Sequence, residues 1–380
     1  MKKNIQILQD LLEIRENEGL LRGLSQLEEG IDFYSNDYLG LAGSQEIEKK
    51  ITSFSNTLKR KLNICTSLGS TGSRLISGNH PIFELFESEC AKFHKAEAAL
   101  FFGSGFEANV GLLAAIGLEN HVIICDKLIH ASLVDGLRLS KAEKRIFKHN
   151  DLADLEKILS QYPLETPKWV IVESIYSMDG DEANLVILQD LSKKYNFELI
   201  VDEAHSGGIY GPNGEGKCVE LELEKEIFAR IITFGKAWGY SGAVVLGSKT
   251  LKNYLINFAR PFIFSTAPTI QHLIDLSGIL SIQSTFSSKR KELYKVINFF
   301  NEQKKSTNWL KSNTAIQSFI IPGNENVRKK AELLQTKGFK VKPIVYPTVP
   351  KGQERIRITL HAFQKQEDIK KIINLLEENE

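Results

Sequence analysis

The chain has 380 residues, of which 42% are hydrophobic and 25% are charged, a composition typical of a globular protein with a sizeable core. Its formal net charge of +1 gives no electrostatic reason to expect binding to nucleic acid or to an anionic membrane surface. No run approaches the roughly 18 apolar residues of a membrane span, and acidic residues interrupt the apolar core that an N-terminal signal peptide would need. We therefore expect a cytoplasmic protein without membrane association.

The cysteines are Cys65, Cys90, Cys125 and Cys218. None of them forms a C-x-x-C pair, so the sequence indicates neither a zinc site nor a disulfide framework. Scattered reduced thiols suit the cytoplasm, and we expect no bound metal.

The first part of the chain predicts two helices with a short strand between them. Residues 1–30 place apolar side chains such as Ile5 and Leu8 at helical spacing, with charged residues on the opposite face. Residues 31–43, IDFYSNDYLGLAG, predict a short strand followed by a turn. Residues 81–93 begin with proline and predict the second helix.

The middle of the chain alternates between apolar runs and helical segments. The runs are HVIICD, KWVIVESIYS, FELIVDEAHS, RIITFGK and GAVVLGS, and segments such as NDLADLEKILSQ separate several of them. Near-continuous apolar strands that alternate with helices indicate an α/β fold with a mostly parallel sheet covered on both faces. The last two runs lie close enough in the chain to form a hairpin.

The pattern changes near residue 290, where strands such as AIQSFIIPG and RIRITL follow a helix and precede another, KQEDIKKIINLLEE. This arrangement predicts a compact α+β unit. We therefore expect three parts. They are an N-terminal arm over residues 1–45 that packs with the small domain, a large α/β domain over 46–285, and a smaller α+β domain over 286–380.

Polar residues gather at the ends of the predicted strands. In an open α/β sheet, ligands bind beyond the carboxyl ends of the strands, so these residues are the first candidates for a site. The polar residues that follow the apolar runs are His130, Ser177, Asp179, Asp202, Glu203, His205, Thr233 and Lys236. The strand ends thus offer carboxylate, imidazole, hydroxyl and amine groups to one crevice.

Each of these residues also has an ordinary structural interpretation. Asp202 and His205 could cap a strand-to-helix turn, Lys236 could be a solvated loop lysine, and His130 could be a buried histidine. The glycine-rich FGSGFEAN lacks the G-K-[ST] ending of a P-loop. A hydrolase triad of Ser177, His205 and Asp202 is conceivable, but no G-x-S-x-G segment supports it.

The combination is typical of a site for pyridoxal phosphate (PLP). The amine of Lys236 can form a Schiff base with a carbonyl, and PLP is the usual carbonyl partner of such a lysine. A carboxylate such as that of Asp202 can keep the ring nitrogen protonated. His130 can stack on the ring, and His205 can donate a hydrogen bond to the phenolic oxygen.

The phosphate of PLP needs hydrogen-bond donors, and backbone N–H groups at a helix N-terminus are suited to this. SGFEANVGLLAAIG supplies a glycine turn that opens a helix. The hydroxyls of Thr233, Ser265 and Thr266 could add further donors.

The chain resembles the α-oxoamine synthases, PLP-dependent enzymes of fold type I. The matching stretches span almost the whole chain in the order of the family. They are FYSNDYLGL, GSTGSRLISGNHPIFELFE, FGSGFEAN, DKLIHASL, ESIYSMDGD, VDEAHSGGIYGPNGEG, TFGKAWGYSGA, FIFSTAP, AIQSFIIPG and YPTVPKGQERIRITL. The resemblance implies a large domain with a mostly parallel seven-stranded sheet, a smaller C-terminal α+β domain, and a homodimer with its sites at the interface.

The resemblance also implies residue roles at the cofactor. Lys236 is the Schiff-base lysine, Asp202 pairs with the ring nitrogen, His205 binds the phenolic oxygen and His130 stacks on the ring. Ser177 lies beside the ring.

Further roles follow for the phosphate and the substrates. Gly105 and Phe106 lie at the start of the phosphate-binding helix, and Thr233 contacts the phosphate. Ser265 and Thr266 reach the phosphate of the partner subunit. For substrates, the implied residues are Asn36 and Arg357 at the amino-acid carboxylate, Thr348 in a substrate-contacting segment, and Arg22 at the acyl substrate. Trp238 and Tyr240 are bulky residues that we expect to shape the mouth of the site.

Within the family, the GNHP segment and the PTVPKGQERIRITL ending favour one activity. It is the condensation of L-alanine with pimeloyl-CoA or a pimeloyl carrier protein to give 8-amino-7-oxononanoate on the way to biotin. The alternatives are sister activities, with glycine and acetyl-CoA (2-amino-3-ketobutyrate ligase) or with a long-chain acyl donor. A non-catalytic relative would be expected to lack the lysine, the aspartate or the stacking histidine, and all three are present.

Overall fold

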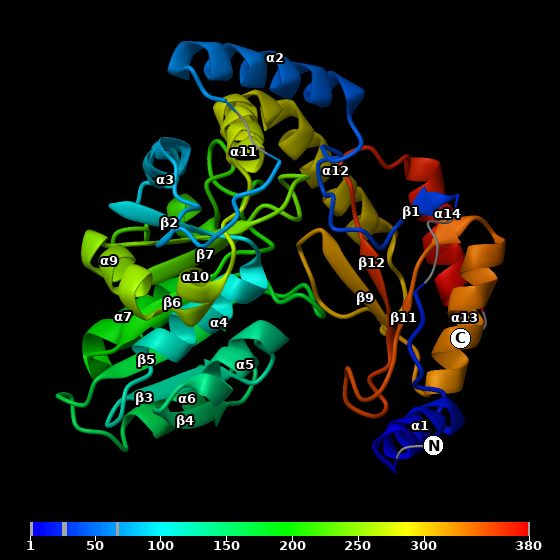
Figure 1. The fold of residues 1–380 in the computed structure, drawn as a ribbon. Coiled ribbons are helices and arrows are strands. Elements are labelled where there is room, and N and C mark those ends of the chain that lie inside the picture. Colours follow the sequence, from blue (N-terminus) through cyan, green and yellow to red (C-terminus); the bar gives the residue numbers. More distant parts are fainter. Residues whose placement is uncertain (1–2, 25–28, 66–67, 379–380) are drawn as a thin grey trace.

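A seven-stranded sheet forms the centre of the larger part of the molecule (Figure 1). The computed structural model describes residues 3–24, 29–65 and 68–378. The strands of this sheet are β2 (Ala98–Phe102), β3 (Val122–Asp126), β4 (Glu143–Phe147), β5 (Lys168–Glu173), β6 (Glu198–Asp202), β7 (Ala229–Thr233) and β8 (Ala243–Gly247).

The strand order is β2-β8-β7-β6-β5-β3-β4. Neighbours from β4 through β7 run parallel, whereas β8 is antiparallel to both β7 and β2. The predicted mostly parallel seven-stranded sheet is therefore confirmed, and β7 and β8 pair as the short spacing of their runs suggested.

Helices cover both faces of this sheet, which explains why its strands are apolar almost throughout. The helices of this part are α2 (Gln45–Leu62), α3 (Pro81–Phe93), α4 (Gly105–Ile116), α5 (Ala131–Leu139), α6 (Leu152–Leu159), α7 (Leu185–Tyr195), α8 (Lys217–Glu220), α9 (Lys249–Phe258), α10 (Arg260–Phe264) and α11 (Ile270–Ile282). One face packs its core against α4, α5, α9 and α10. The other face packs against α6 and α7 at one end and against α3 and α11 at the other.

The C-terminal part has a second, smaller sheet with the order β11-β12-β9, in which both pairings are antiparallel. A separate two-stranded sheet joins β1 and β10 in parallel. The elements of this part are η1 (Gln283–Phe286), α12 (Ser287–Gln303), β9 (Ile316–Ile320), α13 (Asn324–Thr336), β10 (Phe339–Lys340), β11 (Pro343–Ile344), β12 (Arg355–Thr359) and α14 (Gln366–Glu377), together with β1 (Ile31–Asp32) from the N-terminal segment.

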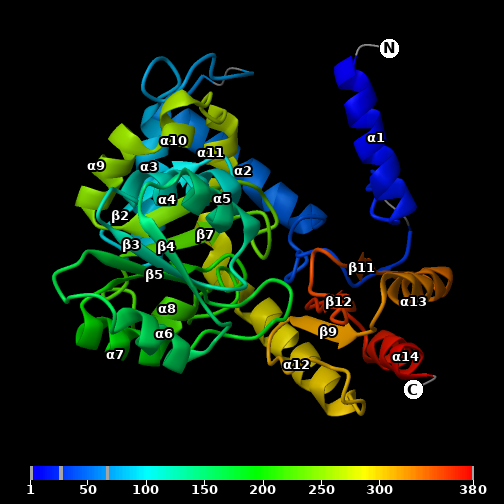
Figure 2. The same cartoon turned by 90° about the horizontal axis from the view of Figure 1, so that it is seen from below.

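The N-terminal helix is shorter than the predicted 1–30. Helix α1 spans Lys3–Asn17, has no buried residue, and lies apart from the large sheet (Figure 2). Gly19 adopts a φ of 65°, a left-handed conformation that glycine tolerates and that is common where a helix ends. Within the described ranges, no helix is long and apolar enough to cross a membrane.

The segment from Phe33 to Ala42 crosses between the two parts of the molecule. The Phe33 carbonyl accepts a hydrogen bond from the Thr359 N–H of the small sheet, at 2.8 Å. At the other end, a Cβ on Gly239 in the loop after β7 would lie 2.6 Å from the Ala42 nitrogen, so the two backbones are in close contact. This crossing carries N-terminal side chains to the ends of the strands in the large sheet.

Candidate active site

A cavity of about 330 Å³ lies at the carboxyl ends of the central strands. Parallel strands end at the same edge of a sheet, so the residues that follow β5, β6 and β7 meet there. The predicted site residues that line the cavity are Asn36, Gly105, Phe106, His130, Asp202, His205, Thr233 and Lys236. The structure therefore brings together the residues predicted to contact the ring of the cofactor, except Ser177.

Lys236 lies in this cavity three residues after the end of β7. Its Nζ is 2.7 Å from Nε2 of His205. Burial of the amine lowers the pKa of Lys236 to about 8, against the opposing effect of the Asp202 and Glu173 carboxylates. A far larger fraction of this amine is therefore neutral near pH 7 than of an ordinary lysine, and a neutral amine is the form that attacks a carbonyl.

Asp202 ends β6 and is only 4% exposed. Its Oδ1 accepts a hydrogen bond from the Ala204 N–H at 2.9 Å, and its Oδ2 accepts one from Nδ2 of Asn109 at 2.8 Å. These two donors fix the plane of a buried carboxylate inside the cavity, as a group that pairs with a heterocyclic nitrogen requires.

His130 is connected to this carboxylate through two residues that the sequence analysis missed. Asn109 also donates to Oγ of Ser132 at 2.9 Å, and that Oγ is 2.7 Å from Nδ1 of His130. The Ser132 N–H donates to the same Nδ1 at 3.2 Å, so the neutral ring carries its proton on Nε2. Partial burial lowers the pKa of His130, which keeps the ring neutral near pH 7.

His205 lies between Lys236 and a tyrosine. Its Nδ1 is 2.5 Å from the hydroxyl of Tyr38, and Nε2 faces the amine of Lys236. Burial, together with the positive charges of Lys236 and Arg357, holds the pKa of His205 well below its usual range. The imidazole is therefore neutral at physiological pH.

Glu173 is a buried carboxyl group in the same cavity. It ends β5 directly beside Asp202 in the sheet register. Burial and the neighbouring Asp202 carboxylate raise the pKa of Glu173 to about 8. Its Oε1 has no hydrogen-bond partner among the residues that the structure describes. A protonated Glu173 avoids placing two negative charges side by side.

Helix α4 begins at the cavity with Gly105, after Ser104 caps it by accepting from the Glu107 N–H at 3.1 Å. A Cβ on Gly105 would lie 2.5 Å from Cγ2 of Thr233, so only glycine fits this close approach. A helix N-terminus, a glycine and a threonine hydroxyl thus share one end of the cavity, an arrangement that favours an anionic group such as phosphate.

A second cavity of about 640 Å³ adjoins the first at His130, which lines both. Ser177 and Thr348 line this second cavity. Arg357 lies between the two regions. Its Nε donates to the Ser177 carbonyl at 2.6 Å, and its Nη2 donates to Oδ1 of Asn36 at 3.1 Å. Of the residues predicted to bind substrate, Asn36 thus lines the cavity that holds Lys236, Arg357 contacts Asn36, and Thr348 lines the second cavity.

Four predicted residues line neither cavity of this chain, and of these only Arg357 contacts a lining residue through a hydrogen bond given above. Arg22 is exposed in the loop after α1. Ser265 and Thr266 follow α10 and line neither cavity, so their predicted role at a partner's phosphate stays a prediction.

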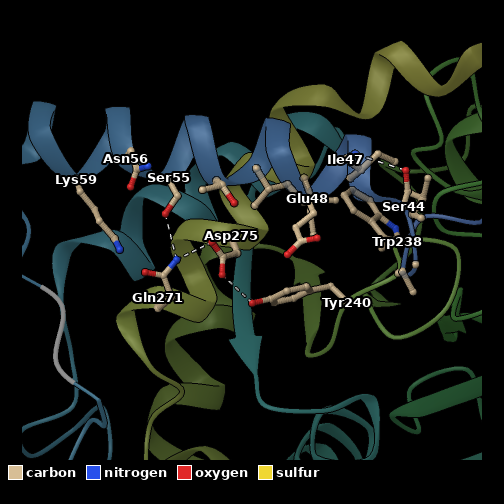
Figure 3. Close-up of a pocket in the computed structure, with 17 residues that line it drawn as sticks. Ser44, Ile47, Glu48, Ser55, Asn56, Lys59, Trp238, Tyr240, Gln271 and Asp275 are labelled. Atoms are coloured by element: carbon tan, nitrogen blue, oxygen red, sulfur yellow. Dashed lines mark hydrogen bonds between the residues drawn. The ribbon is translucent and has the colours of Figure 1, made fainter.

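The expectation for Trp238 and Tyr240 needs a correction. Both line a different cavity of about 530 Å³ between α2 and α11 (Figure 3), which shares no lining residue with the cavity that holds Lys236. Trp238 is 1% exposed, and the Tyr240 hydroxyl donates to Oδ2 of Asp275 at 3.1 Å. These two side chains therefore lie outside the cavity that Lys236 lines.

The donor set of the first cavity fits PLP. The amine of Lys236 has a lowered pKa, and the buried Asp202 carboxylate is held in a fixed plane. Gly105 leaves a phosphate-sized approach at a helix N-terminus, because a Cβ there would collide with Thr233. Fold and site together define the class, which is that of the PLP-dependent enzymes of fold type I.

Comparisons with known proteins agree with this class. The family model described as "Aminotransferase class I and II" matches residues 28–376. An 8-amino-7-oxononanoate synthase of Lysinibacillus sphaericus is 34% identical, over 96% of this chain and 95% of the relative. The chain therefore belongs to the aminotransferase class I and II family of PLP-dependent enzymes, in its α-oxoamine synthase branch.

Solved structures give the same fold. That of 8-amino-7-oxononanoate synthase from Francisella tularensis matches with a TM-score of 0.75 at 28% identity, over 91% of this chain and 96% of that chain. A serine palmitoyltransferase of Sphingomonas wittichii matches with a TM-score of 0.86, over 99% of this chain and 96% of that chain. Its 24% identity makes this second match a statement about fold alone.

Proposed function

We propose that the protein catalyses the decarboxylative condensation of L-alanine with a pimeloyl thioester to give 8-amino-7-oxononanoate. The observation that carries the proposal is the buried amine of Lys236, which has a lowered pKa and shares one cavity with the Asp202 carboxylate and with Asn36. Arg357 donates to Asn36 at the edge of this cavity. Such an arrangement supports a reaction that anchors a carboxylate at one end of the site and moves a proton at the other. The relatives named 8-amino-7-oxononanoate synthase favour this choice of substrates.

When bound, PLP supplies an electron sink that stabilises negative charge on the Cα of an amino acid. In the proposal, the Asp202 carboxylate holds the proton of the ring nitrogen, and the neutral amine of Lys236 takes the Cα proton. Because the pKa of Lys236 is lowered to about 8, the amine can both accept and return a proton near neutral pH. His130 would stack on the ring, and His205 would donate a hydrogen bond to the phenolic oxygen.

In the proposal, the remaining groups of the site bind the two substrates. Arg357 is 9% exposed, so an amino-acid carboxylate that replaced its contact with Asn36 would form a strong, largely desolvated ion pair. The adjoining cavity of about 640 Å³ is suited to the acyl thioester, since Ile129, Val134 and Val349 line it. Arg22 would serve the acyl substrate, and the carrier would be CoA or a carrier protein.

We also propose a homodimer with shared active sites, in which Ser265 and Thr266 complete the phosphate site of the partner subunit. This would explain why neither residue lines the cavity of its own chain. The sister reactions, with glycine and acetyl-CoA or with a long-chain acyl donor, use the same cofactor contacts and become outcomes of the test below.

The test is thiol release by the PLP-loaded protein. Pimeloyl-CoA, acetyl-CoA and palmitoyl-CoA are each offered with L-alanine, glycine or L-serine, and the product is identified by mass. We expect release only with L-alanine and pimeloyl-CoA, together with 8-amino-7-oxononanoate. The PLP-treated Lys236→Ala variant is the control and should release no thiol. Release with another pair alone would replace the proposed activity by that sister reaction.

A further inference from the structure

Tyr38 is a buried residue to which the predicted site assigns no role. It comes from the N-terminal segment and is 1% exposed. Its hydroxyl lies 2.5 Å from Nδ1 of His205 and 3.3 Å from Oδ1 of Asn36. A hydroxyl has a single proton, so Tyr38 can donate to only one of these two acceptors at a time.

The contacts decide which acceptor receives this proton. Oδ1 of Asn36 already accepts from Arg357 at 3.1 Å, and its contact with Tyr38 is the longer of the two. Burial raises the pKa of Tyr38 to about 12, so the hydroxyl keeps its proton. The shorter contact takes the proton, so Tyr38 donates to Nδ1 of His205, and the 3.3 Å contact with Asn36 then lies between two acceptor oxygens. A neutral imidazole that accepts at Nδ1 carries its own proton on Nε2.

We propose that Tyr38 is a positioning residue that fixes His205 in the Nε2–H form and, through it, favours the neutral amine of Lys236. Nε2–H can donate to the lone pair of a neutral amine at the observed 2.7 Å, but it cannot accept a proton from an ammonium group. The same N–H is the donor that a phenolic oxygen of PLP would meet. The inference deepens the proposed function, because it concerns the proton state of the same lysine.

Several other charged or titratable groups act on this amine. Those that face it from the surrounding elements are Glu173 on β5, Asp202 on β6, Arg357 on β12, and His130 and His205 from the loops after β3 and β6. The carboxylates favour the charged amine and Arg357 opposes it. All of these side chains are retained when Tyr38 is replaced, and the proton position on His205 is the one feature that we expect to change. A comparison of variants therefore isolates the effect of the Tyr38 hydroxyl on His205.

The variant Tyr38→Phe removes this hydroxyl and keeps the ring. Its matched control is Tyr210→Phe, because Tyr210 is 4% exposed in the same apolar core and its hydroxyl has no hydrogen-bond partner in the described chain. The rate constant of PLP uptake by the apoprotein is measured against pH, since uptake requires the neutral amine of Lys236. We expect the pH midpoint to rise by about 1 unit in Tyr38→Phe, the effect of one hydrogen bond to a charged site, and to stay unchanged in Tyr210→Phe.

A second measurement needs no Tyr38 variant. Imidazole nitrogen NMR of the ¹⁵N-histidine-labelled wild-type apoprotein reports which ring nitrogen carries the proton, and the signals lost in His205→Asn assign those of His205. We expect the proton on Nε2. A proton on Nδ1, or equal midpoints in Tyr38→Phe and Tyr210→Phe, would overturn the inference. Neither measurement uses an amino acid or a thioester, so failure of the thiol-release test leaves this inference standing.

Discussion

Two histidines at the same edge of the large sheet have opposite proton states. His205 faces the amine of Lys236 and has a pKa well below the usual range, because it is buried near cations. His149, after β4, lies between two carboxylates, with Nδ1 2.9 Å from Asp126 and Nε2 2.8 Å from Asp181. Burial lowers the pKa of His149, but the hydrogen bonds to these carboxylates outweigh it and raise the pKa to about 10.

The difference shows how one sheet edge provides both a reactive site and a structural clamp. At His149 every charge has a partner, so the ring stays protonated and joins the loops after β3, β4 and β5. In the Lys236 cavity, His205 is neutral and the pKa of Lys236 is lowered to about 8, so a larger fraction of this amine retains a lone pair for chemistry than in an ordinary lysine. Burial lowers the pKa of both histidines, and the neighbouring charges decide whether the pKa ends above or below its usual value.

The largest effect is expected for Lys236→Ala. The amine that moves the substrate proton is lost, so thiol release should fall below detection, a loss of at least about 10⁴-fold. Borohydride reduction, which traps PLP on the wild-type lysine, should trap none on the variant. Circular dichroism should show an unchanged fold. Turnover near the wild-type rate in this variant would contradict the assignment of Lys236.

Asp202→Asn is expected to come next, with a loss of about 10²-fold or more in kcat. The amide keeps an acceptor for Asn109 but has no charge to hold a proton on a ring nitrogen, which weakens the electron sink. The matched control is Asp275→Asn, in the cavity behind the Lys236 loop, which should change kcat by less than about twofold. Equal losses in the two variants would show that the effect of Asp202 is structural.

His149→Gln should change stability more than catalysis. It leaves Asp126 and Asp181 without their cation, and breaking such a partly buried pair costs about 3 kcal/mol. The pKa of His149 in the folded protein, about 10, exceeds the ordinary histidine value of 6.5. The protonated ring therefore stabilises the fold fully below about pH 6.5, and this contribution is lost as the pH rises towards 10.

Urea unfolding of wild type and His149→Gln between pH 6 and 10 tests this sign. The difference in the free energy of unfolding should be largest at pH 6 and shrink towards pH 10. A difference that stays constant across this range would mean that His149 is not protonated in the folded protein. Asp275→Asn, which removes a carboxyl group far from the clamp, should show no such pH dependence.

The strand-end residues could be predicted from the sequence because their position follows from the topology. Asp202 ends an apolar run, and His205 and Lys236 follow such runs closely; parallel strands bring these ends together. The predicted helix at 81–93 likewise begins at Pro81 and ends at Phe93, because proline is favoured in a first turn.

The residues that set proton states could not be found in this way. Tyr38 meets His205 across 167 positions of sequence, and Asn109 meets Asp202 across 93. No local spacing encodes such contacts. A weaker signal existed for Asn109, a polar residue between apolar neighbours in a mostly apolar helix, whose buried amide must find a partner. The end of α1 was also misplaced, since apolar spacing continues into a loop beyond Gly19.

The smallest effect is expected for Tyr240→Phe, four residues after Lys236 in the same loop. The Tyr240 hydroxyl donates to Asp275 in the cavity of about 530 Å³, which Lys236 does not line (Figure 3). Its loss removes one partly buried hydrogen bond, which should lower the free energy of unfolding by about 1 kcal/mol and leave kcat/KM within about twofold of wild type. Denaturant unfolding measures the free energy of unfolding, and thiol-release kinetics measure kcat/KM. A loss above tenfold in kcat/KM with unchanged stability would show that the cavity lined by Tyr240 takes part in catalysis. Asp275→Asn would then no longer be a valid control, because Asp275 lines the same cavity.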